Sequence, residues 1–110
     1  MPFRAILETL VDMHAPGVRA AIFCDAEGER IDACCGELGA FDVDVIGASF
    51  AALAPSLKPG ELLRSVHDDA VFWVMPVDEG CYLVVWCRRC GDFGFKNDLP
   101  SIGRALAAYM

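Results

Sequence analysis

Two cysteines, Cys87 and Cys90, have a spacing that could support chemistry. The C-x-x-C spacing occurs in zinc knuckles and thiol redox sites, and the two arginines between the cysteines would lower a thiol pKa. A tetrahedral metal site needs two further ligands, and the sequence has no second C-x-x-C. Cys34 or His67 completes a site only if the fold brings it near. A thiol or zinc protein that uses Cys87 and Cys90 therefore stays as an alternative interpretation.

Other catalytic arrangements find little support. The sequence contains no P-loop, no G-x-S-x-G and no dinucleotide-binding fingerprint. His14 closes a predicted helix, where a cation meets the helix dipole favourably, and His67 precedes a polar turn. The pair Arg88-Arg89 could act in trans on a GTP phosphate, but basic residues at a strand end are usually solvated. We therefore predict no catalytic residues, no cofactor and no bound metal.

The composition predicts one domain, residues 1–110, and excludes several kinds of partner. The hydrophobic content is 55%, which is more apolar surface than a monomer of 110 residues easily buries. A net charge of -7 argues against nucleic acid and against anionic membrane surfaces. No apolar run approaches the roughly 20 residues of a membrane span, and the first residues do not resemble a signal peptide. We expect a cytoplasmic protein with reduced cysteines and no membrane insertion.

The elements that would position any site are arranged around a predicted helix over residues 42–57, with Asp42 as its N-cap. Its bulky apolar stripe consists of Val43, Ile46, Phe50, Leu53 and Leu57. Its other side carries small residues in place of the usual charges: Ala48, Ala51, Ala52 and Pro55. A helix that is apolar all round is buried on more than one side, which predicts a second copy or another partner on the small-residue side. The alternative is a featureless exposed face, because Ala is the best helix former.

The rest of the chain predicts an α+β fold. Amphipathic helices occupy both ends of the chain, and Arg4 is placed to pair with Glu8 in the first. Strands are expected over residues 18–24, 29–35, 61–67, 70–75 and 81–87. The second and third of these are half polar, as edge strands are, and the others are apolar on both faces. With hairpin connections this predicts an antiparallel sheet in the order 2-1-5-4-3, with the end helices on one face and the organising helix on the other.

This pattern resembles the roadblock/dynein light chain family. The stretches that carry the resemblance are GVRAAIFCDAEGERI, AALAPSLKPGELLRSV and VFWVMPVDEGCYLVVWC, and together they cover nearly the whole chain. The family includes bacterial MglB-like regulators of Ras-like GTPases. The resemblance implies a non-enzymatic adaptor that forms a homodimer, or pairs with a paralogue, through its second helix and third strand. It also implies docking of a small Ras-like GTPase, whose hydrolysis is stimulated without an arginine finger. A structural subunit of a larger complex is the other open interpretation.

The resemblance also suggests which residues make these contacts. By position, the dimer interface would comprise Ala48, Ala51, Ala52, Pro55, Leu62, Arg64 and Val66. The partner-binding residues would be Asp44, Ser49, Asp68 and Asp69. The six cysteines and the C-R-R-C segment depart from commoner members of the family, which leaves the branch and the effect on GTP hydrolysis open.

Overall fold

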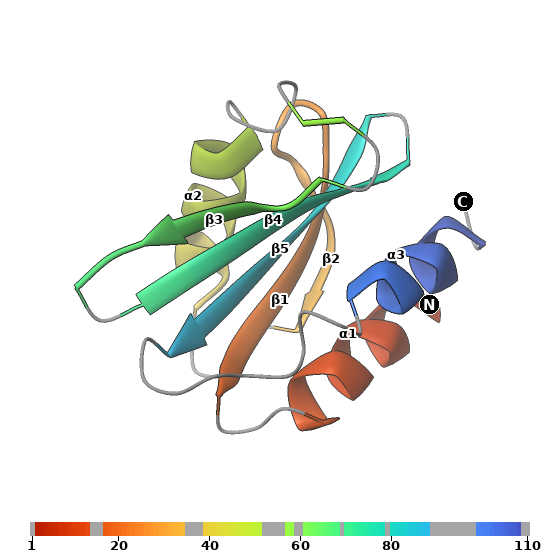
Figure 1. Ribbon diagram of the computed structural model, residues 1–110, viewed down its shortest axis with the longest axis horizontal. Helices are drawn as coiled ribbons and strands as arrows, with labels where there is room; N and C mark the ends of the chain where they lie inside the picture. Colours follow the sequence, from red (N-terminus) through yellow and green to blue (C-terminus); the bar gives the residue numbers. More distant parts are fainter. Residues whose placement is uncertain are drawn as a thin grey trace.

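The computed structural model describes residues 2–13, 17–34, 39–51, 57–58, 61–68, 70–78, 80–88 and 99–108. Within these residues, three helices and five strands follow one another in the predicted order, and Figure 1 shows the sheet between two helical layers. The elements are α1 (Pro2–Met13), β1 (Val18–Asp25), β2 (Arg30–Cys34), α2 (Ala40–Ala51), β3 (Leu63–Val66), β4 (Ala70–Asp78), β5 (Cys81–Arg88) and α3 (Leu99–Ala107).

The five strands form one antiparallel sheet in the order β2-β1-β5-β4-β3, which confirms the predicted topology. The two half-polar strands, β2 and β3, lie at the edges. The apolar strands β1, β4 and β5 lie inside, because a strand buried on both faces needs cover on both. Gly28 and Gly80 have φ angles of 85° and 77°, and they allow the tight β1–β2 and β4–β5 turns.

The helices α1 and α3 cover one face of the sheet and contact each other. The core there is built around fully buried side chains from both helices and the central strands, including Leu7, Leu10, Phe23, Leu83 and Leu106. Phe3 of α1 meets Phe23 of β1 with ring centroids 5.2 Å apart. The outer side of α1 is charged, as expected for a helix with one buried face.

The helix α2 covers the other face and packs mainly on β1, β2 and β5. Alternation along β5 directs Tyr82 and Val84 toward α2 and Leu83 and Val85 toward α1 and α3. Phe50 anchors α2 in a smaller core, whose other members are Ile22, Cys24, Ala33, Val74, Tyr82 and Val84.

Several predicted boundaries and one ion pair are wrong. The organising helix begins at Ala40, so Asp42 lies in its first turn, and Leu57 is not helical. The edge strands are shorter than predicted, since β2 begins at Arg30 and β3 spans Leu63–Val66. The predicted ion-pair partner of Arg4 is Glu8. In the structure Arg4 pairs with Asp32 of β2, and its Nε lies 2.9 Å from Asp32 Oδ1. His14, Cys35 and Asp98 lie outside the described residues.

Candidate docking surface

The outward side of α2 is small and largely uncharged. Val45 is 47% exposed, and Ala48 and Ser49 beside it are exposed as well. Ser49 Oγ donates a hydrogen bond to the Val45 carbonyl at 2.8 Å, so this hydroxyl is satisfied within the helix. The mean hydropathy of the chain is high at +0.41, and this side of α2 is one place where apolar surface is left outside the core.

The inward side of α2 approaches the β1–β2 hairpin closely at Gly47. A Cβ at Gly47 would lie 3.3 Å from the Gly28 carbonyl oxygen and 3.8 Å from Ile22 Cγ2. Gly47 is therefore needed for the helix to lie against the sheet. We did not predict a role for Gly47 from the sequence, although a glycine inside a predicted helix indicates close packing, since it costs about 1 kcal/mol relative to Ala.

An ion pair ties α2 to the same hairpin. Arg30 Nε of β2 lies 3.5 Å from Asp44 Oδ1, with both side chains partly exposed. Together with Gly28 and Glu29 they line a shallow groove beside the helix. An exposed pair of this kind contributes roughly 0–1 kcal/mol, so its main effect is to orient the two side chains.

The outer edge of β3 is the second part of the surface. No described strand pairs with this edge, because β3 ends the sheet next to β4. Val66 is 45% exposed. Leu63 and Ser65 are half-buried on the α2 side, opposite Val74 and Phe72. An exposed edge strand offers unpaired backbone donors and acceptors to another chain.

The predicted dimer residues fall on two different faces. Ala48 is exposed on α2, and Ala51 is the last residue of that helix that the structure describes. Ala52 and Pro55 lie outside the described residues. Leu62, however, packs against the core under α1 and α3, and Arg64 lies over Trp73, 5.8 Å from its ring centroid, on that same face. Strand alternation places Val66 with them. The residues of β3 that share the α2 face are Leu63 and Ser65.

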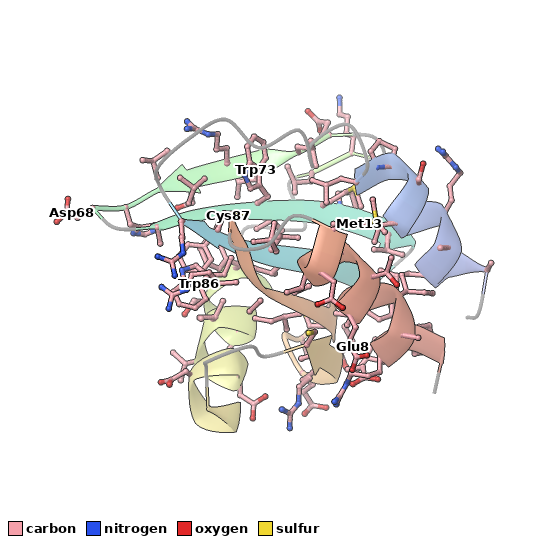
Figure 2. All side chains as sticks on the ribbon, turned by 90° about the horizontal axis from the view of Figure 1, so that it is seen from below. Glu8, Met13, Asp68, Trp73, Trp86 and Cys87 are labelled. Atoms are coloured by element: carbon pink, nitrogen blue, oxygen red, sulfur yellow. The ribbon has the colours of Figure 1, made fainter. Side chains whose placement is uncertain are left out.

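The predicted partner-binding residues are also dispersed. Asp44 and Ser49 both lie on the exposed part of α2. Asp68 lies at the tip of the β3–β4 hairpin, which Figure 2 shows projecting away from the helices. Asp69 lies outside the described residues. The geometry thus joins Asp44 and Ser49 in one surface and leaves Asp68 apart from it.

The cysteine site of the alternative interpretation is described only in part, and Cys34 packs against the same core as Cys87. Cys87 is fully buried in the core under α1 and α3, and burial raises its thiol pKa to about 12. At neutral pH it is therefore a protonated thiol, which is a poor nucleophile and a poor metal ligand. His67 lies on the other face of the sheet, edge-on to Phe72 with centroids 5.4 Å apart. Cys90 lies outside the described residues.

His67 has one further contact that could suggest chemistry. Its Nε2 lies 2.9 Å from Ser65 Oγ on the same strand edge. A nucleophilic serine also needs a group that orients the histidine and donors for an oxyanion. Within the described residues, neither accompanies this exposed pair.

Comparison with solved structures identifies the architecture. The model superposes on MglC from Myxococcus xanthus with a TM-score of 0.77, 21% identity and complete coverage of both chains. It superposes on a roadblock/LC7 domain from Streptomyces avermitilis with a TM-score of 0.70 and 17% identity, covering 96% of this chain and 88% of that one. The chain has the roadblock/LC7 fold.

Another roadblock-type structure agrees at lower identity. The gliding protein MglB from Thermus thermophilus matches with a TM-score of 0.82 and 15% identity, covering 97% of this chain and 87% of that chain. No protein-family model matches the sequence, and no curated protein matches it. At these identities the likeness establishes the roadblock fold. No helix among the described residues is long and apolar enough to cross a membrane.

Proposed function

We propose that the protein is a non-enzymatic, homodimeric adaptor that binds a Ras-like small GTPase in the cytoplasm and modulates its GTP hydrolysis. The observation that carries the proposal is the exposed, small and apolar side of α2, formed by Val45, Ala48 and Ser49. In a roadblock fold, an outward face of the second helix that is small and exposed favours a partner at that face. The outward face of α1 is charged and needs none.

A second copy fits both parts of the surface. Two β3 edges can pair antiparallel about a two-fold axis, which extends one sheet through both copies and satisfies the free backbone groups. The α2 helices then lie on the same face of the extended sheet. The small side chains of Ala48 and Ser49 permit close approach of two helix backbones. A roadblock paralogue in place of the second copy would use the same surface.

The GTPase is proposed from the roadblock resemblance and from the structural likeness to MglB. The chain would act as a platform, with the paired α2 helices presenting Asp44 and Ser49 to the GTPase. The GTPase would keep its own catalytic machinery, and the adaptor would alter its conformation. A net charge of -7 favours a docking partner with a basic surface.

The test is a binding and hydrolysis assay with the Ras-like GTPases of the source organism, each loaded with GDP or with a GTP analogue. The wild type is compared with Ala48→Glu, which places a charge on the outward side of α2. The matched control is Ala5→Glu, because Ala5 is an exposed alanine on the outward side of α1. We expect nucleotide-dependent binding that Ala48→Glu weakens at least tenfold and Ala5→Glu leaves unchanged.

Two results would contradict the proposal. Binding that ignores the bound nucleotide would favour a structural subunit of a larger complex. An equal loss of binding in both variants would show that the added negative charge acts regardless of its position. The α2 surface would then not be the docking site.

A further inference from the structure

A basic and aromatic patch lies on the α2 side of the sheet, at the end where β1 begins and β5 ends. Its members are Arg19 of β1, Phe72 of β4, Trp86 and Arg88 of β5, and His67 after β3. Figure 2 shows Trp86 at this end, among side chains that carry nitrogen atoms and far from α3. The Arg88 backbone N–H donates to the Gly17 carbonyl at 2.8 Å, which joins the two strand ends.

A β-bulge places Arg19 over this patch. The pairing of β1 with β5 runs from Val18 with Cys87 to Ala20 with Trp86, so Arg19 is the extra residue in the ladder. Its guanidinium Cζ lies 4.1 Å from the Trp86 ring centroid. Bulges commonly redirect a side chain next to a functional site. Val18 pairs with Cys87 on the α1 and α3 face, whereas Ala20 pairs with Trp86 on the α2 face. Strict alternation counted back from Ala20 would place Arg19 on the α1 and α3 face, away from Trp86.

The aromatic rings beneath Arg19 form a connected series. Trp86 and Phe72 are stacked with an interplanar angle of 16° and centroids 6.4 Å apart. The Phe72 ring centroid lies 4.9 Å from that of Phe50 of α2 and 5.4 Å from that of His67. Arg19, Phe72 and Trp86 are all half-buried. The series holds the guanidinium against a rigid apolar base that is linked to α2.

The charge of the patch contrasts with the rest of the chain. The protein has 16 acidic residues against 9 basic ones, yet Arg88 shares the face of Trp86 by strand alternation and is exposed. Arg19 and Arg88 thus lie at one end of the sheet, where the His67 ring contacts Phe72. Asp68 follows His67 at the hairpin tip and offsets part of this charge.

We propose that the patch is a docking site for a short acidic segment of a partner protein. A guanidinium that stacks on an aromatic face presents its N–H groups sideways, in a geometry that suits bidentate carboxylate binding. The aromatic base would hold the aliphatic part of a Glu or Asp side chain. The proposal goes beyond the GTPase function, because it concerns a different surface and requires no nucleotide.

The net negative charge of the whole chain favours a short acidic ligand over a long one. A net charge of -7 repels long polyanions such as nucleic acids, whose binding depends on many phosphate contacts at once. Contacts beyond about 8 Å are screened at physiological salt. A short segment with a few carboxylates therefore gains the local contacts of Arg19 and Arg88 and avoids most of the repulsion.

The test uses a fluorescein-labelled octaglutamate peptide as the probe and an octaglutamine peptide as its uncharged control. Binding to the full chain is followed by fluorescence anisotropy at low and physiological salt, and the Trp86 indole resonance is followed by NMR. We expect saturable binding of octaglutamate that shifts the Trp86 resonance. We expect Arg19→Gln to weaken this binding at least tenfold and Arg19→Lys to weaken it several-fold. Arg104→Gln, which removes the same charge from exposed α3, should change it less than twofold.

Each other outcome overturns the proposal. Equal weakening by Arg19→Gln and Arg104→Gln would show non-specific charge attraction. Stronger displacement of the peptide by inorganic phosphate than by free glutamate would identify a phosphate site. An Arg19-dependent rise in mass without peptide would identify a second copy as the occupant. Circular dichroism of each variant distinguishes a loss of folding from a loss of binding. If Arg19→Gln is unfolded, the Arg19→Lys variant decides the test.

Discussion

The two faces of the sheet are covered to different degrees. On the α1 and α3 face, thirteen of the described side chains are buried in one core, and the outer side of α1 carries charges. On the α2 face the buried core has seven described members, and Phe72 and Trp86 beside it stay half-buried. The outer side of α2 has Val45, Ala48 and Ser49 exposed. Among the described residues, the first face has the larger buried core, and the second leaves small side chains exposed on the outer side of its covering helix.

This difference predicts which side chains contribute to folding and which contribute to association. A side chain under α1 and α3 contributes to folding by burial, since apolar area removed from water stabilises by about 25 cal/mol per Å². A side chain on the outward side of α2 contributes little within one copy. Its substitution should therefore alter association and leave folding nearly intact.

The largest expected effect is on the closed face. Leu7 is fully buried, so Leu7→Ala should lower the free energy of unfolding by about 2–5 kcal/mol through lost burial and a cavity. Val45→Ala should change it by less than about 0.5 kcal/mol in the monomer, since Val45 is 47% exposed. Urea unfolding at low protein concentration measures both. Similar losses in the two variants would remove the distinction between the faces.

An intermediate effect compares two glycines at which helices meet the sheet. A Cβ at Gly47 would press on the backbone oxygen of Gly28 at 3.3 Å, whereas one at Gly103 of α3 would meet the flexible end of Met75 at 2.8 Å. Both alanines gain roughly 1 kcal/mol of helix propensity. We expect Gly47→Ala to destabilise by about 1 kcal/mol and Gly103→Ala to be close to neutral, because Met75 can move and a backbone cannot.

Thermal unfolding of the two glycine variants, followed by circular dichroism, decides this comparison. A larger loss for Gly103→Ala would show that α3 is held more rigidly on the sheet than α2. The close approach of α2 would then not be the feature that fixes its position.

The smallest effect concerns alkaline pH. Burial raises the pKa of the Cys87 thiol to about 12 and that of the Cys24 thiol to about 11. Unfolded thiols ionise first as the pH rises above about 9, so the stability that the buried thiols contribute is present below that pH and is lost above it. The melting temperature of Cys87→Val should therefore fall less between pH 8 and pH 10 than that of the wild type. An identical fall would mean that Cys87 ionises normally in the folded chain.

The architecture could be predicted from the sequence because strand composition reports burial directly. The half-polar strands around Asp32 and Arg64 had to be edges, and the apolar ones between them had to be central. Hairpin connections then left one strand order. The boundaries of α2 were less predictable, since its small residues carry a weak periodic signal at both ends.

The surface could be predicted only in part. The exposed side of α2 follows from its small residues, and Ala48 lies there as predicted. The placement of Leu62 and Arg64 on the other face depends on the register of β3 with β4, which the sequence pattern did not define. The bulge that lifts Arg19 over Trp86 leaves no trace in composition. Gly47 could have been found, because a glycine inside a helix needs a reason.

The most direct test of the open face is the mass in solution, by light scattering under reducing conditions, of the wild type, Ala48→Glu and Ala5→Glu. We predict a wild-type dimer, a folded monomer for Ala48→Glu and a dimer for Ala5→Glu, because an unpaired charge in a close-packed interface is strongly unfavourable. A wild type that stays monomeric at high concentration would contradict the homodimer. A dimer that Ala48→Glu leaves intact would contradict the role of α2 in it.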